Sequence, residues 1–130
     1  MVKFNTFVMK AIPTTFHAFI DYGSAIVFLV APWIFLFDHV TAAKWTSVIV
    51  GALILLMSLL TRYESGLLRI IPMRMHLAVD IVIGLFLVLS PWLMGFADQT
   101  FLFHVFMGVV SVIMGAFTKR YVKSDNLALR

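Results

Sequence analysis

Two histidines and two aspartates recur with one spacing in the two halves of the chain. His17 precedes Asp21 by four residues, and His76 precedes Asp80 by four residues. Both pairs lie in long apolar stretches, where ionisable side chains are costly and normally face the protein interior. If the four meet, two imidazoles and two carboxylates could bind a divalent metal such as zinc or manganese, or pass protons. The two imidazoles alone could be axial ligands of a haem iron.

The spacing places each pair on one face of a helix. At about 100° per residue, four residues leave a histidine and its aspartate about 40° apart around the axis. We therefore expect bonds across the helices, from His17 to Asp80 and from His76 to Asp21, or bonds within each helix at the four-residue spacing. The pattern favours a structural role for these four residues, in which they fix how the helices pack. A metal site, a haem site and a proton path are the alternatives, and no particular cofactor is predicted.

The composition is that of a membrane protein. The chain has 130 residues, of which 62% are hydrophobic and 12% charged, and its mean hydropathy is +1.04. Globular chains average about 45–50% apolar and about 25% charged residues. This composition excludes a soluble domain, a disordered chain and a nucleic-acid-binding protein. The chain has no cysteine, so disulfides, thiolate metal sites and cysteine nucleophiles are excluded as well.

Four apolar stretches are each about as long as a membrane span, which needs roughly 20 residues to cross about 30 Å of hydrocarbon. Each is expected to be a helix, because lipid-exposed backbone must satisfy its own hydrogen bonds. The connections are short, so consecutive helices are antiparallel neighbours. The sequence thus predicts an all-α, polytopic four-helix bundle that forms a single membrane domain over residues 1–130. The expected spans are 15–37, 42–61, 76–96 and 101–118.

Basic residues predict the orientation. Nine of the ten lysines and arginines lie in the two tails or in the connection 62–75, and only Lys44 lies on the other side. Cytoplasmic loops carry the excess of positive charge, so both termini are expected in the cytoplasm.

The chain also repeats itself. A shift of 59 residues superimposes the two His-x3-Asp pairs, and a shift of 57 superimposes the second helix of each half. We predict two tandem two-helix repeats, over about 12–61 and 71–118. An even number of helices per repeat makes the repeats parallel, with a pseudo-two-fold axis along the membrane normal. The superimposed positions are Ile12-Pro13 with Ile71-Pro72, Pro32-Trp33 with Pro91-Trp92, Phe37 with Phe96, Gly51 with Gly108, and Thr61 with Thr118.

A tripeptide stands downstream of each His-x3-Asp pair. The second copy is Ser90-Pro91-Trp92 and the first is Ala31-Pro32-Trp33. With these motifs, most of the chain resembles the SPW repeat family of small prokaryotic membrane proteins, named for the tripeptide. It departs from the family only at Ala31, so a hydroxyl cannot be required in both halves. The resemblance implies a multi-pass protein of the prokaryotic cytoplasmic membrane and no particular activity.

The tripeptides are expected at helix–helix or membrane interfaces. Pro32 and Pro91 should kink or end their helices, because each removes one backbone hydrogen bond. Trp33 and Trp92 then suit the headgroup layer, where an indole N–H meets polar groups.

The motifs favour a non-enzymatic packing or interaction module in a homo-oligomer or membrane complex, because the sequence contains no catalytic motif. Its expected partners are the lipid bilayer and either further copies of itself or another membrane protein. One alternative is a small transporter or proton-conducting protein that uses the His/Asp quartet. The other is a haem- or metal-binding membrane redox protein.

Overall fold

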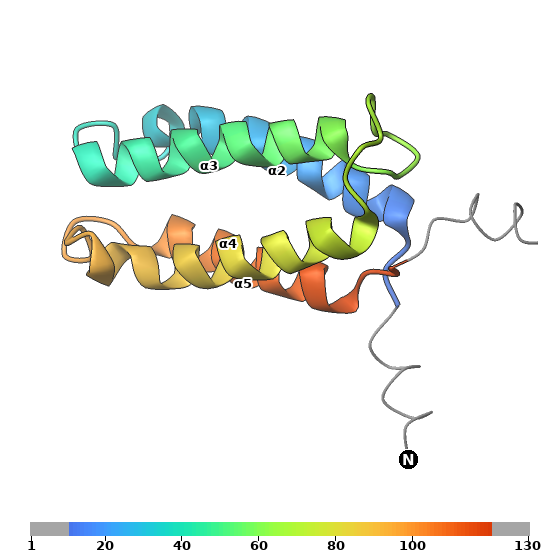
Figure 1. Cartoon of the computed structure of the whole chain (residues 1–130). Helices are drawn as coiled ribbons and strands as arrows, with labels where there is room; N and C mark the ends of the chain where they lie inside the picture. Colours follow the sequence, from blue (N-terminus) through green and yellow to red (C-terminus); the bar gives the residue numbers. More distant parts are fainter. Residues whose placement is uncertain (1–10, 121–130) are drawn as a thin grey trace, which may run out of the picture.

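Four helices form two antiparallel hairpins (Figure 1). The computed structural model describes residues 11–120. Helices α2 (Thr14–Ile34) and α3 (Thr41–Leu60) form the first hairpin, and α4 (Met73–Leu93) and α5 (Leu102–Phe117) form the second. Within this part of the chain only isolated bridges pair extended backbone. The predicted all-α four-helix fold is therefore confirmed.

Three of the four helices are long and apolar enough to cross a membrane, namely α2, α3 and α4. The fourth, α5, is apolar but has only 16 residues, which corresponds to about 24 Å. The expected span 101–118 is thus too long by one residue at each end. Thr118 leaves the helix because its backbone is extended and pairs with Ile12.

Two matched bridges join the hairpins at their inner ends, which are the ends where α2 and α4 begin. Ile12 pairs with Thr118, and Ile71 pairs with Thr61. In the first bridge the Ile12 N–H donates to Phe117 at 3.1 Å, and in the second the Ile71 N–H donates to Leu60 at 2.8 Å. Each bridge therefore connects the start of one half to the end of the other. The tandem-repeat arrangement stays a prediction of the sequence, and these paired contacts support it.

Prolines mark both ends of α2 and α4. Pro13 and Pro72 are the N-cap residues. Pro32 and Pro91 lie inside the helices, each of which ends two residues later, as expected for a residue that interrupts helical hydrogen bonding.

Within each hairpin, glycines let the helix backbones approach closely. A Cβ atom on Gly84 would lie 2.7 Å from the carbonyl oxygen of Gly108, and one on Gly108 would lie 2.7 Å from that of Gly84. A Cβ atom on Gly51 would lie 2.8 Å from the Cβ of Phe28. Small residues at such contacts are typical of membrane helices, because packing rather than hydrophobic burial drives their association.

An apolar cluster fills the centre of the bundle. It contains Phe28 from α2 and Leu87 from α4, both fully buried. Phe103 of α5 packs against the same cluster, with its ring centroid 5.2 Å from that of Phe28. Residues from different hairpins thus share one core.

Replacing Gly84 by alanine should destabilise the protein by about 1–3 kcal/mol, because the new methyl group meets backbone atoms of α5 that cannot move aside. Unfolding of the detergent-solubilised protein, followed by circular dichroism, measures the effect. Gly23→Ala is the matched control, since a Cβ there meets nothing within 4 Å. Equal stabilities of the two variants would contradict the close backbone contact.

Candidate functional site

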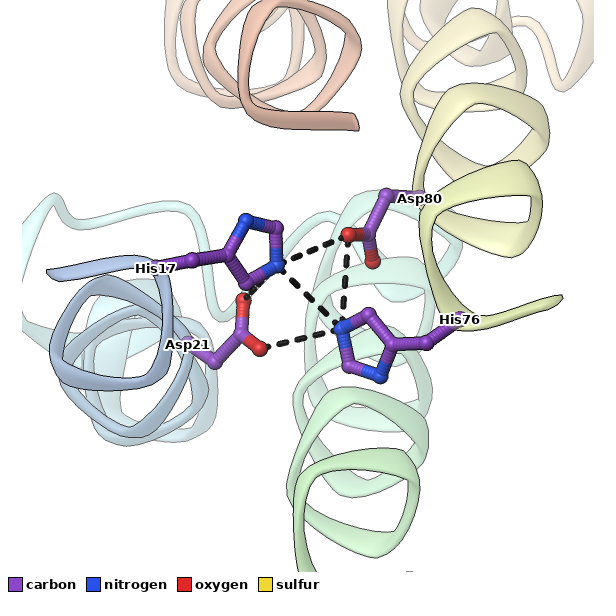
Figure 2. A group of neighbouring side chains, drawn as sticks. All are labelled: His17, Asp21, His76 and Asp80. Carbon is purple, nitrogen blue, oxygen red and sulfur yellow. Dashed lines mark hydrogen bonds and ion pairs between the residues drawn. The ribbon is translucent and has the colours of Figure 1, made fainter. Parts of the chain in front are cut away.

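The structure brings the four predicted polar residues together where the two hairpins meet (Figure 2). His17 and Asp21 are the fourth and eighth residues of α2, and His76 and Asp80 hold the same places in α4. All four side chains are buried and point toward one shared centre. We call these four residues the quartet.

Both pairings expected from the sequence occur at once. Across the helices, His17 Nε2 lies 3.0 Å from Asp80 Oδ2, and His76 Nε2 lies 3.0 Å from Asp21 Oδ2. Within the helices, the Nε2 atoms lie 3.2 Å from Asp21 Oδ1 and 3.3 Å from Asp80 Oδ2. The two Nε2 atoms are themselves 3.3 Å apart. Each carboxylate therefore contacts both imidazoles.

Two threonines hold the other ring nitrogens. His17 Nδ1 lies 2.8 Å from Thr118 Oγ1, and His76 Nδ1 lies 2.7 Å from Thr61 Oγ1. The Thr61 hydroxyl donates its proton to the Met57 carbonyl at 2.6 Å, so its oxygen must accept a bond from the Nδ1–H of His76. This bond orients the imidazole with Nε2 toward the centre of the quartet.

The connection between α3 and α4 covers the inner face of the quartet. The Tyr63 hydroxyl donates to Asp21 Oδ2 at 3.4 Å, and the Tyr63 ring packs beside His76. Burial raises the pKa of Tyr63, which keeps its hydroxyl protonated as a donor. The Thr14 hydroxyl donates to the Glu64 carboxylate at 2.8 Å and so fastens this connection to the start of α2.

Sequence reasoning did not assign a role to these supporting residues. The two threonines do carry a signal, because the 57-residue shift superimposes Thr61 on Thr118. Tyr63 carries no such signal, since the same shift places it on Arg120. Its contact with Asp21 depends on the path of the connection between α3 and α4.

The tripeptide residues lie away from the quartet, toward the outer ends of α2 and α4. Pro32 is eleven residues beyond Asp21, or about 16 Å along the helix. Trp33 and Trp92 are 55% and 61% exposed, so neither lines an internal site. Ala31, Pro32, Ser90 and Pro91 are buried.

The difference between Ala31 and Ser90 has a local explanation. The Ser90 hydroxyl donates to the Leu87 carbonyl at 2.9 Å, within its own helix. It therefore makes no bond to the other hairpin that alanine would lose, and a methyl group fits the buried position in the first half.

Haem does not fit between the two histidines. Their Nε2 atoms are 3.3 Å apart, and both carboxylates contact the same atoms, so no space remains for a macrocycle. A single ion is small enough for this space, because one ligand atom from each of the four residues lies within 4.8 Å of all the others.

Replacing Thr61 by valine should destabilise the protein by about 1–3 kcal/mol, because the Nδ1–H of buried His76 loses its acceptor. Unfolding in detergent micelles measures this loss. Thr41→Val, at the exposed start of α3, should leave stability unchanged and serves as the control. A Thr61→Val variant as stable as that control would show that the hydroxyl does not hold the ring.

The family comparison agrees with the sequence motifs. The chain matches the family model of the SPW repeat domain over residues 15–118, a range that contains the whole quartet and both tripeptides. It matches no curated protein and no solved structure. The match covers most of the chain, and so this membrane protein belongs to the SPW repeat domain family.

Proposed function

We propose that this protein is a non-enzymatic packing module of the prokaryotic cytoplasmic membrane, with both termini in the cytoplasm. It acts as a preformed unit within a homo-oligomer or beside another membrane protein. The observation that carries this proposal is that the quartet is turned inward, with its four side chains contacting one another between the hairpins. Polar groups used in this way fix the arrangement of helices.

The contacts between hairpins support a role in specifying geometry. Hydrogen bonds between membrane helices contribute only about 0.6 kcal/mol on average, so they add little stability. Mispairing is costly, however, because a carboxylate would remain buried without a partner. A second polar contact joins the hairpins near their outer ends, where buried His104 Nε2 lies 3.1 Å from the Ala43 carbonyl oxygen. The hairpins are thus held in one register at both ends.

The outward faces supply the surface for lipid and for neighbouring helices. Large apolar side chains such as Phe19, Val82 and Phe106 are more than 60% exposed in the isolated chain. Within a bilayer such faces are covered by acyl chains or by other membrane proteins. Trp33 and Trp92 suit the outer headgroup layer and fix the depth of the module.

Conduction of protons or solutes by the quartet finds less support. A cavity of about 20 Å³ adjoins Asp21 and Asp80, with room for about one water molecule. Phe28 and Ile54 line the same cavity and belong to the central apolar cluster. Ser24 and Ser111 also line the cavity, and along α2 this polar lining gives way to the apolar cluster at Phe28.

Neutralising the quartet should change the assembly of the protein. The variant carries His17→Gln, Asp21→Asn, His76→Gln and Asp80→Asn, which remove the ion pairs between the hairpins at nearly constant side-chain volume. Native mass spectrometry from nanodiscs should give an altered distribution of oligomer masses. The control exchanges three loop residues in the same way, as Asp38→Asn, His39→Gln and Asp98→Asn. A folded quartet variant with the mass distribution of the unaltered protein would count against the packing role.

The proposed orientation is tested by labelling, because the natural chain has no cysteine. A cysteine introduced at Gln99, in the outer connection, should react with a membrane-impermeant maleimide in intact cells. A cysteine at Ser65, in the inner connection, should react only after the membrane is permeabilised. The reverse pattern would place both termini outside.

A further inference from the structure

The facing atoms of the quartet lie close enough together for a single small ion to bind all four residues. Zinc binds imidazole nitrogen at about 2.0–2.1 Å and carboxylate oxygen at about 2.0–2.2 Å. The edge of a tetrahedron is about 1.6 times the distance from its centre to a corner, so the ligands of such an ion lie roughly 3.3–3.5 Å apart. The two Nε2 atoms are 3.3 Å apart, and Asp80 Oδ2 lies 3.0 and 3.3 Å from them. Asp21 contacts His17 with Oδ1 at 3.2 Å and His76 with Oδ2 at 3.0 Å, so one of its two oxygens would complete the set.

The hydrogen bonds of His76 also suit a metal ligand. The Nδ1 of His76 carries a proton, because the Thr61 oxygen that it contacts has already donated its own to Met57. In the neutral ring the Nε2 of His76 then directs its lone pair toward the centre of the quartet, where it faces the Nε2 of His17. Without a metal, two protonated imidazoles would balance the charge of the two carboxylates. A divalent cation with two neutral imidazoles and two carboxylates gives a neutral group.

One buried carboxylate oxygen depends on the two imidazoles alone. Asp80 Oδ2 is inaccessible to solvent, and its polar contacts among the described residues are the two Nε2 atoms, at 3.0 and 3.3 Å. The Asp80 residue is only 8% exposed. Buried carboxylate oxygens are normally paired or bound to a metal. This atom points to the shared centre of the quartet (Figure 2).

We propose that the quartet binds one divalent transition-metal ion of the zinc class. The ligands are Nε2 of His17 and His76 and one carboxylate oxygen from each of Asp21 and Asp80. Magnesium and calcium do not suit this set, because they take six or more ligands, mainly oxygens. Two nitrogens and two oxygens in a small buried site suit zinc.

The groups around the quartet are those that support a metal site. Histidine ligands usually donate their second N–H to a fixed acceptor, which sets the tautomer and the orientation of the ring. Thr61 fills this place for His76, and Thr118 lies at the same position beside His17. Four protein ligands complete a tetrahedron, which is typical of structural sites rather than catalytic ones. The ion therefore joins α2 to α4, a property beyond the packing role proposed above.

Metal binding is tested with the full-length protein in detergent, stripped with a chelator and reloaded with Zn²⁺ or Co²⁺. After unbound ions are removed, elemental analysis should give one metal per chain. The Co²⁺ form should show the intense visible absorption of a tetrahedral complex, and excess Mg²⁺ should not displace the ion. Absence of bound metal, or the weak absorption of octahedral Co²⁺, would overturn the proposal. This test needs only the unaltered protein.

Variants then locate the ion. Asp80→Asn and His76→Gln should each lower metal affinity at least tenfold, whereas His39→Gln, in the outer loop, should leave it unchanged. Thr61→Val retains all four ligands and should weaken binding by about 10–100-fold through the ring orientation. Metal binding that survives loss of both Asp80 and His76 would place the ion elsewhere and refute this assignment.

Discussion

Two carboxylates buried in an apolar bundle are the constraint on which the rest of this structure depends. Asp21 and Asp80 lie one turn beyond the histidines of their own helices, where a charge without a partner is very costly. Each carboxylate contacts two imidazoles, one from each hairpin. The hairpins therefore have to meet at this level. Each hairpin requires the other equally, because each supplies one histidine and one carboxylate.

The inner ends of the helices follow from this meeting point. A helix leaves its last four carbonyls without partners inside the helix. The Thr61 hydroxyl donates to one of them, that of Met57, and accepts the Nδ1–H of His76 with the same oxygen. One side chain thus helps end α3 and orients an imidazole on α4. The backbone bridge from Thr61 to Ile71 holds this threonine in place.

The two ends of α2 and α4 have different structural roles. The inner end holds the polar quartet, the threonines and Tyr63, which tie one hairpin to the other. The outer end holds the tripeptides that characterise the family, where Pro32 and Pro91 lie close to the helix termini and the tryptophans face outward. The apolar cluster around Phe28 and Leu87 separates them. The tripeptide therefore shapes the outer end of the helix, about three turns away from the quartet.

The sequence by itself determined the helices, because apolar length and flanking prolines act along one segment. It placed α2, α3 and α4 within a few residues, and the four-residue spacing put each histidine and aspartate on one face. Only the tertiary structure decided that cross-helix and within-helix pairs form together, since both oxygens of Asp21 are used. It also decided that Thr118 leaves α5 and that Tyr63 reaches Asp21. Such contacts depend on how closely the helix backbones approach each other and on the path of each connection. The residue pattern along a single helix predicts neither of these.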